Sequence, residues 1–386
     1  MRDLLVMPGS GAYRVLARSR MLRLAGVDVE TPLLIPAVSS RALGPIEVTD
    51  GRRTVRKPAS AVHTDVLIRR IDGALLVSAH DIQRRLVDNA GAFQRGFKAS
   101  AYATVKVMFI DSGWYEKGVE DSTSYWYPRT GQEPNARPTR ARSTKGLRKR
   151  APKRVPGPFG PDEWAQTIDS LDPDIPAVVV SWDHHGTYGR QIRAAQDFFG
   201  SRDSLSSDLL LKPPKKERYY NFTELSAADA QHLAAFGVIG VTEKELGDNL
   251  RARLVAIADL RRLLDGASVD APIHVFGGLD PLLTPLYVAA GAEIFDGLTW
   301  LRYGFHDGLS ISTDQAVVMS KSYDKRFSRC STQMQMANLT EMEQLAQELK
   351  AFVARGCDWS KLPHEDVLRP AHEAFEIALK GSKNGR

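Results

Sequence analysis

Eight short apolar runs, spaced along the chain, constrain its fold more than any other feature of the sequence. Most are continuously apolar and β-branched rather than alternating, which is typical of strands buried on both faces of a parallel sheet. The runs are TPLLIPAV (31–38), GALLVSA (73–79), VKVMFID (105–111), PAVVVSWD (176–183), DLLLK (208–212), GVIGVT (237–242), APIHVFGG (271–278) and GAEIFDG (291–297). Helical patterns separate several of them, at 190–199, 226–236, 243–264 and 281–290. Eight strands with helical crossovers predict an α/β fold, a (β/α)8 barrel of the TIM type, with a doubly wound open sheet as the alternative.

Two segments interrupt this alternation, and we expect both to be insertions. Residues 45–72 carry mixed charge after the first run, and residues 117–160, rich in Pro, Gly, Arg and Lys, follow the third. Beyond the eighth run, amphipathic patterns at 337–355 and 364–380 predict a C-terminal helical extension. The sequence therefore predicts a single barrel domain over residues 1–386.

The positive charge is concentrated in one segment. Residues 129–154 hold ten basic side chains and one acid, a net charge of +9 in a chain whose total is +6, so the rest is slightly acidic at −3. The basic residues are Arg129, Arg137, Arg140, Arg142, Lys145, Arg148, Lys149, Arg150, Lys153 and Arg154. This asymmetry is typical of proteins that bind a polyanion, although a solvated surface loop has the same composition.

Other features exclude several classes of protein. No stretch approaches the roughly 18 to 20 uninterrupted apolar residues of a membrane helix, and the start of the chain lacks the apolar segment of a signal peptide. We expect a soluble, cytoplasmic protein with no membrane partner. Two cysteines, Cys330 and Cys357, are too few for a disulfide framework or a cysteine-based zinc site.

Three carboxylates end three of the apolar runs. They are Asp111, Asp183 and Asp296. In a TIM-type barrel the active site forms at the carboxyl ends of the strands, so all three are expected at one mouth. A single aspartate after a strand is ordinarily a turn or cap residue, but three such residues together suit chemistry at a sugar anomeric carbon.

The residues beside these carboxylates suggest what the site binds. Trp114 and Tyr115 follow Asp111, where one of them could stack on a flat heterocycle or, equally, pack in the core. His184 and His185 follow Asp183, but neighbouring residues of an extended strand point to opposite sides, and no zinc motif surrounds them. We therefore predict no metal site.

Taken together, these motifs resemble those of the tRNA-guanine transglycosylase superfamily, in the same order over most of the predicted barrel. The matching segments are TPLLIPAVSS, LLVSAHDI, FIDSGWYE, VVVSWDHH, GVIGVTEKE and IHVFGGLDPLLTPLYVAAGAEIFDGLTWLR. The resemblance implies a barrel enzyme, a pentosyltransferase that replaces guanine in a nucleic acid with a 7-deazaguanine base such as 7-cyano-7-deazaguanine.

The resemblance also implies roles for individual residues. Asp296 matches the nucleophile that bonds to C1′, and Asp111 matches its general acid and base. Residues in positions that contact the base are Asp183, Tyr115, Glu116, Ser112, Val238, Ile239, Gly240 and Gly277. Glu116 stands where the family has a glutamine, and Arg302 matches an arginine that contacts the nucleic-acid backbone.

Two departures from the family affect the substrate that we expect. The cysteine cluster that binds zinc in members acting on tRNA is absent, with Cys330 alone in RFSRCSTQMQMANL, and KPPKK (212–216) replaces a Gln-Gly-Gly motif. A branch of the superfamily modifies DNA, and the basic segment could contact phosphates near the mouth, so we expect DNA rather than tRNA as the substrate. The mechanism that the resemblance implies needs no cofactor. Accessory proteins are possible partners in addition to the nucleic acid.

Three alternatives are kept. The chain could be a divergent transglycosylase acting on tRNA, or a non-catalytic nucleic-acid-binding subunit, since the superfamily contains such partners. Retention of all three aspartates argues against the subunit, because binding alone does not need them. An ordinary barrel glycosidase would leave the basic segment and the aromatic residues unexplained.

Overall fold

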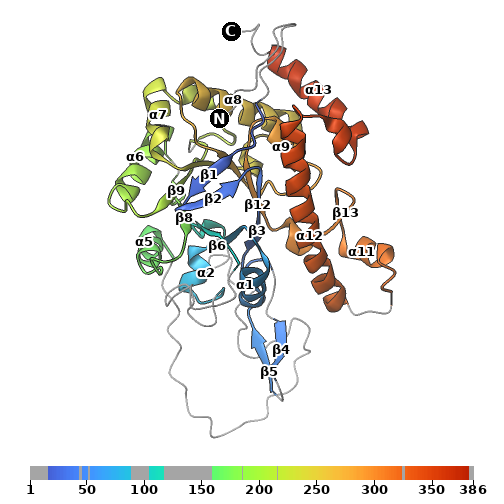
Figure 1. Ribbon diagram of the computed structural model, residues 1–386. Helices are drawn as coiled ribbons and strands as arrows, with labels where there is room; N and C mark the ends of the chain where they lie inside the picture. The colour runs from blue at the N-terminus through green and yellow to red at the C-terminus, as the bar shows by residue number, and fades with distance from the viewer. Residues whose placement is uncertain are drawn as a thin grey trace, which may run out of the picture.

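The computed structural model describes residues 16–42, 46–50, 53–87, 104–116, 159–184, 186–214, 216–323 and 327–381. At its centre, eight parallel strands form a closed barrel (Figure 1). In chain order they are β3 (Leu33–Val38), β6 (Ala74–Ser78), β7 (Val107–Asp111), β8 (Ala177–Val180), β9 (Ser206–Leu210), β10 (Val238–Thr242), β11 (Ile273–Phe276) and β12 (Ile294–Gly297). Each strand pairs with the next, and β12 closes the ring on β3, with Asp296 opposite Ile35. The predicted TIM-type barrel is confirmed, and each apolar run supplies one strand.

The strands separate two apolar layers, because successive side chains of a strand point to opposite faces. In β6, Ala74 and Leu76 belong to the cluster inside the barrel, whereas Leu75 and Val77 pack outward against the helices. The helices around the barrel are α1 (Ala59–Arg70), α2 (Ala79–Gln83), α5 (Pro161–Asp169), α6 (Tyr188–Phe199), α7 (Ala227–His232), α8 (Leu250–Gly266) and α9 (Thr284–Ala289). Short 3-10 turns occur at η2 (Phe222–Glu224), η3 (Leu233–Ala235) and η4 (Glu243–Glu245). Burial on both faces explains why the strands are continuously apolar.

A small hairpin covers the amino-terminal end of the barrel. Its strands, β1 (Met21–Leu24) and β2 (Val27–Glu30), are joined by Ala25 and Gly26, both with positive φ, as in a type I′ turn. Its inward side chains, which join the cluster inside the barrel, are Leu22, Leu24 and Val29. Just before β12, Glu293 is 2.8 Å from Nε of Arg20 and fixes the hairpin at this end. The sequence analysis did not predict this hairpin.

The segment at 45–72, expected to be an insertion, has two different parts. Its first part forms a hairpin of β4 (Ile46–Asp50) and β5 (Arg53–Lys57), which lies below the barrel in Figure 1. Its second part is α1, the helical crossover between β3 and β6. Most of the second expected insertion, residues 117–158, lies outside the described residues.

The chain continues after the barrel with a hairpin and several helices. These elements are α10 (Thr299–Arg302), β13 (Gly304–His306), β14 (Leu309–Ile311), α11 (Thr313–Met319), α12 (Phe327–Ala354), η5 (Trp359–Lys361) and α13 (Glu365–Gly381). Asn338 of α12 joins that helix to α10, since its amide donates to the backbone oxygens of Trp300 and Tyr303, both at 2.7 Å, and the indole N–H of Trp300 donates to the backbone oxygen of Ala37 in β3 at 3.0 Å. Helix α12 begins ten residues before the helix predicted at 337–355. Among the described helices, none is long and apolar enough to cross a membrane.

Candidate active site

The carboxyl ends of the strands bring the three predicted aspartates together. Asp111 is the last residue of β7, Asp183 follows β8, and Asp296 lies in β12. Burial is the main cause that raises the pKa of Asp111 to about 7. The negative charges of Asp183 and Asp296 contribute the rest of this increase. Because both charges act on Asp111, the three carboxylates share one site. Near neutral pH, Asp111 can therefore both give and accept a proton.

The turn after β7 depends on a glycine. Gly113 has φ of +85°, and a Cβ there would lie 2.5 Å from Cβ and 2.9 Å from the backbone nitrogen of His80. Such distances exclude any side chain unless the neighbouring backbone moves. The DSG sequence thus allows β7 to end against α2 with Asp111 and Ser112 directed at the mouth.

Asp183 is buried and held by two partners. Ser112 donates a hydrogen bond from Oγ to its Oδ2 at 2.5 Å, and Lys212 Nζ lies 3.4 Å from its Oδ1. Lys212 also donates to Glu245 at 2.9 Å and to Thr242 at 3.0 Å. Burial opposes the charge of Lys212, but the two carboxylates outweigh it and raise its pKa. Lys212 is therefore a cation that fixes Asp183 rather than an amine nucleophile.

Asp296 is also buried and held through one oxygen. The backbone N–H of Gly277 donates to Oδ1 at 3.0 Å, and Nε2 of His274 lies 3.3 Å from the same atom. His274 in turn contacts Asp208 inside the barrel at 2.7 Å. Among the described residues, both polar groups named here contact Oδ1 of this carboxylate. Oδ2 is therefore the oxygen that can approach a substrate.

Glu116 lies close to Asp111 and to Asp81 of α2. It accepts a hydrogen bond at 2.5 Å from Ser39 Oγ, while its buried Oε2 has no hydrogen-bond partner among the residues described. Burial, followed by the charges of Asp81 and Asp111, raises its pKa well above the ordinary value. A neutral carboxyl has one donor and one acceptor, as a glutamine amide does. Glu116 can therefore replace the expected glutamine without adding a charge.

Exposed aromatic and arginine side chains border the mouth. Trp114 and Tyr115 are 38% and 39% exposed. The Arg41 guanidinium lies 4.3 Å from the centre of the Tyr115 ring, and Arg302 donates to the Tyr115 hydroxyl at 3.1 Å. Because Arg41 covers one face of Tyr115, a base can stack only on the other face unless Arg41 moves. The two arginines present positive charge next to the carboxylates.

The remaining predicted residues occupy different layers. Ser112 contacts Asp183 and Gly277 contacts Asp296, so both belong to the site. Val238 faces the inside of the barrel, whereas Ile239 packs in the outer layer against the helices. Gly240 lies against the ring of Phe276 inside the barrel. All three are the first residues of β10, so they precede its carboxyl end at Thr242, which faces the mouth.

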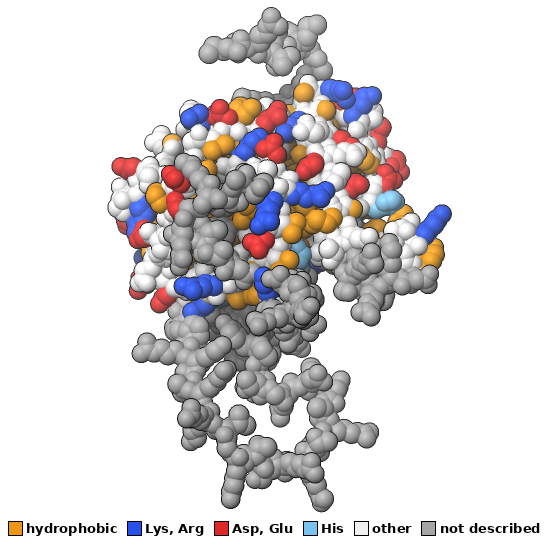
Figure 2. All heavy atoms as spheres, turned by 60° about the horizontal axis from the view of Figure 1, so that its bottom comes forward, with side chains coloured by type: hydrophobic (Ala, Val, Ile, Leu, Met, Phe, Trp, Pro, Cys, Tyr) orange, Lys and Arg blue, Asp and Glu red, His pale blue; other side chains and the backbone are white. Residues whose placement is uncertain are grey.

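The basic segment lies outside the described residues. Its predicted contacts are Arg137, Arg140, Arg142, Lys145, Arg148, Lys149, Arg150, Lys153 and Arg154. On the described surface seen in Figure 2, Lys and Arg side chains alternate with Asp and Glu rather than forming one positive field. On this face, the described residues therefore offer no continuous positive patch to a polyanion.

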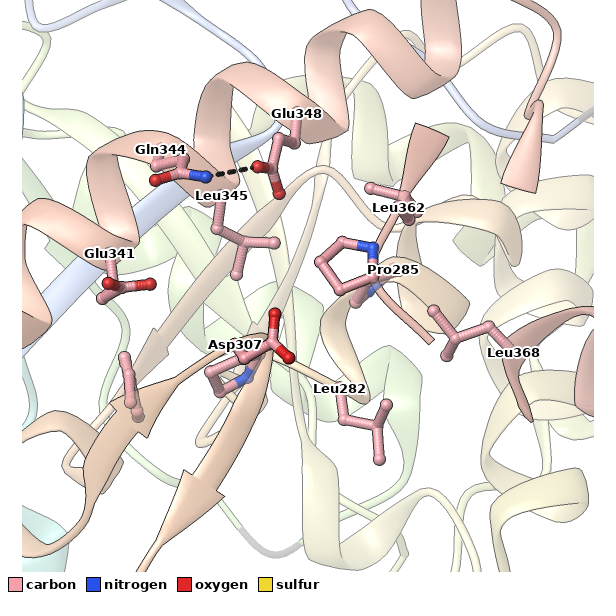
Figure 3. A pocket seen from close by; sticks show the side chains of 13 residues that line it. Leu282, Pro285, Asp307, Glu341, Gln344, Leu345, Glu348, Leu362 and Leu368 are labelled. Atoms are coloured by element: carbon pink, nitrogen blue, oxygen red, sulfur yellow. Dashed lines mark hydrogen bonds between the residues drawn. The ribbon is translucent and has the colours of Figure 1, made fainter. Parts of the chain in front are cut away.

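The described residues offer little to a metal or to a small molecule elsewhere. They contain no group of three or more His, Cys, Asp or Glu side chains that could hold a metal ion. A pocket of about 70 Å³ lies between the β13–β14 hairpin and α12, where Gln344 donates to Glu348 at 2.7 Å (Figure 3). Small-molecule sites are usually about 300 Å³ or larger. None of the three aspartates lines this pocket, so we do not assign the chemistry to it.

Sequence reasoning missed several residues of the site. Asp208 and His274 are single polar residues inside apolar runs, and that interruption was the available signal. Arg41 directly follows the first strand end, and its contact with Tyr115 joins residues 74 positions apart. Lys212 ends the apolar run DLLLK, but nothing in the sequence indicates its contact with Asp183.

Comparison with known proteins adds no identification. No protein-family model matches the chain, and no curated protein matches it. The function is therefore argued from the site itself.

Proposed function

We propose that this protein is a base-exchange transglycosylase that replaces guanine in a nucleic acid, with DNA as the favoured substrate, by a 7-deazaguanine base. One observation supports this proposal above all. The charges of Asp183 and Asp296 raise the pKa of Asp111, so the three carboxylates lie close together at the mouth of a TIM-type barrel. Their surroundings differ, so each suits a different task.

The reaction divides between Asp296 and Asp111. Oδ2 of Asp296 attacks C1′, the bond from C1′ to N9 breaks, and its electron pair leaves with guanine, which receives a proton from Asp111. The sugar is then bonded to Asp296. The incoming base loses its N9 proton to Asp111, N9 attacks C1′, and the bond to Oδ2 breaks. Asp296 is again a carboxylate and Asp111 is again protonated.

Base recognition falls to Asp183 and Glu116. The Asp183 carboxyl accepts hydrogen bonds from the N–H groups of the guanine Watson–Crick edge, and Lys212 and Ser112 hold it in position. The pKa of Glu116 is raised well above its ordinary value, and a protonated Glu116 donates a hydrogen bond to O6 of guanine or of a 7-deazaguanine.

The choice of DNA rests on the sequence and on charge. The zinc cluster of tRNA-modifying members is absent from the sequence, and the basic segment at 129–154 supplies cations for phosphate contacts. Arg41 and Arg302 would contact phosphates beside the target nucleotide. A target in duplex DNA must leave the stack, at a cost of a few kcal/mol.

The proposal is tested by incorporation of a labelled 7-deazaguanine base. The protein is incubated separately with duplex DNA, single-stranded DNA and unmodified tRNA, and wild type is compared with Asp296→Asn. Asp203→Asn is the matched control, because this exposed carboxylate lies before β9, at the opposite end of the barrel. We expect incorporation into DNA by wild type and by the control, and none by Asp296→Asn.

The other outcomes are equally informative. Incorporation into tRNA alone would replace DNA by tRNA as the substrate and leave the chemistry intact. No incorporation into any of the three, with tight salt-sensitive binding retained, would refute the enzyme and favour a binding subunit.

A further inference from the structure

An ion pair inside the barrel has no role in the reaction described so far. Asp208 of β9 and His274 of β11 are both fully buried, and Nδ1 of His274 lies 2.7 Å from Oδ2 of Asp208. Their strand neighbours Leu210 and Phe276 belong to the inner cluster, so both side chains point into the barrel. A buried polar pair in an apolar interior is costly and is retained where it has a function or a specific structural role.

The imidazole ring has a fixed position. Phe276 packs on it with ring centres 3.8 Å apart, and Phe109 of β7 meets it edge-on at 5.5 Å. On β10, a Cβ at Gly240 would lie 2.5 Å from the Phe276 ring and 2.8 Å from Oδ1 of Asp208. Four strands thus enclose the ring and leave its second nitrogen directed to one side.

That second nitrogen points toward the proposed nucleophile. Nε2 of His274 lies 3.3 Å from Oδ1 of Asp296, within ion-pair range. It is buried and, among the described residues, has no partner that meets hydrogen-bond geometry. A small movement of Asp296 would complete a chain from Asp208 through His274 to the carboxylate.

The charge of the ring follows from its neighbours. Burial would lower the pKa of His274, but the carboxylates of Asp208 and Asp296 outweigh it and raise the pKa to about 9. Asp208 from β9 and Asp296 from β12 are the charged groups that face the ring, and Phe109, Gly240 and Phe276 are neutral. His274 is therefore an imidazolium at neutral pH.

We propose that His274, oriented by Asp208, is a positioning residue that supplies a buried positive charge to Oδ1 of Asp296 and directs Oδ2 toward C1′. The inference rests on the proposed function, because it gives Asp296 the role of nucleophile. The cation stabilises the carboxylate before attack and again when it departs from C1′. Gly277, which donates to the same oxygen, holds the other side of the carboxylate.

A purely structural ion pair would have different consequences. Such a pair would affect the free energy of unfolding but not the pH dependence of catalysis. A charge beside the nucleophile makes the rate depend on the protonation of His274 itself, whose pKa is about 9.

The first measurement reads the charge of His274 without any substrate. Histidine ¹⁵N NMR of the free protein, with the signal assigned by its loss in His274→Gln, is expected to show both ring nitrogens protonated at pH 7 and a midpoint near 9. In Asp208→Asn the midpoint is expected to fall by about one pH unit or more. A neutral His274 at pH 7 would overturn the inference whatever the protein catalyses.

The second measurement is the single-turnover rate of base exchange from pH 5 to pH 9. His274→Gln, which keeps an amide donor without the charge, is expected to lower the rate about tenfold at pH 7 and below, where the wild-type ring is charged, with the difference shrinking toward pH 9. His306→Gln, at an exposed site in β13, is the matched control and is expected to behave as wild type. A His274→Gln profile equal to wild type would overturn the positioning role while leaving the proposed function standing. Absence of exchange by the wild-type protein would overturn both.

Discussion

The turn between Asp111 and Trp114 permits a quantitative test of how the site is built. Gly113→Ala introduces a methyl group at φ of +85°, which costs about 1 to 2 kcal/mol in backbone energy. The lower entropy of the unfolded alanine chain offsets about 0.4 to 1 kcal/mol of this. The methyl would also lie 2.5 and 2.9 Å from atoms of His80, one of them in the backbone, and such overpacking costs about 1 to 3 kcal/mol. We expect a net loss of about 2 to 4 kcal/mol in the free energy of unfolding.

Gly26→Ala separates the two contributions. Gly26 has nearly the same φ, +78°, but a Cβ there meets nothing within 4 Å, so this variant is expected to lose about 1 kcal/mol or less. Equilibrium unfolding in urea measures both variants, and unchanged m-values would show that the unfolded states are comparable. If the two variants lost the same free energy, the close approach of Gly113 to His80 would not constrain the turn. Our explanation of the DSG sequence would then be wrong.

Four further predictions concern the groups around the mouth. Burial and two neighbouring carboxylates raise the pKa of Asp111 to about 7. Above that pH, kcat/KM for the nucleic acid is therefore expected to fall about tenfold per pH unit. A profile that stays flat to pH 9 would exclude Asp111 as the acid. The raised pKa of Asp111 also lowers the free energy of unfolding as the pH rises from about 4 to 7. In urea unfolding at pH 8, Asp111→Asn is therefore expected to be more stable than wild type. This difference is expected to shrink toward pH 4. Lys212→Met removes the cation between two acids and is expected to cost about 3 kcal/mol in urea unfolding, and a loss below about 1 kcal/mol would contradict its role. Arg41→Ala and Arg302→Ala are each expected to raise KM with little change in kcat. Each is also expected to reduce the slope of log Kd against log salt concentration by about one. An unchanged slope in both variants would mean that neither arginine contacts phosphate.

The barrel was predictable because its strands have a strong local signal. A strand buried on both faces must be apolar at nearly every position, and runs such as PAVVVSWD stand out from their surroundings. The β1–β2 hairpin lacks that signal, because its strands have four residues each and include charged side chains such as Arg23 and Asp28. Helix α1 was missed for a related reason, since its sequence, ASAVHTDVLIRR, has only a weak apolar face and lies in a segment of mixed charge.

The site was predictable only where one residue carried its own evidence. An aspartate that ends an apolar run can be recognised alone, and the structure brings Asp111, Asp183 and Asp296 to the same mouth. The contact of Asp208 with His274 joins positions 66 residues apart, and no local pattern announces such a pair. The raised pKa of Glu116 likewise follows from its burial beside Asp81 and Asp111, which only the folded chain creates.

The closure of the barrel on β3 has a consequence for how the protein matures on the ribosome. Until β12 has been synthesised, β3 and β11 each present an open edge, which is a template for association with other chains. The strand that removes both edges is the strand that carries Asp296. A chain that lacks β12 therefore lacks both the closed sheet and the proposed nucleophile.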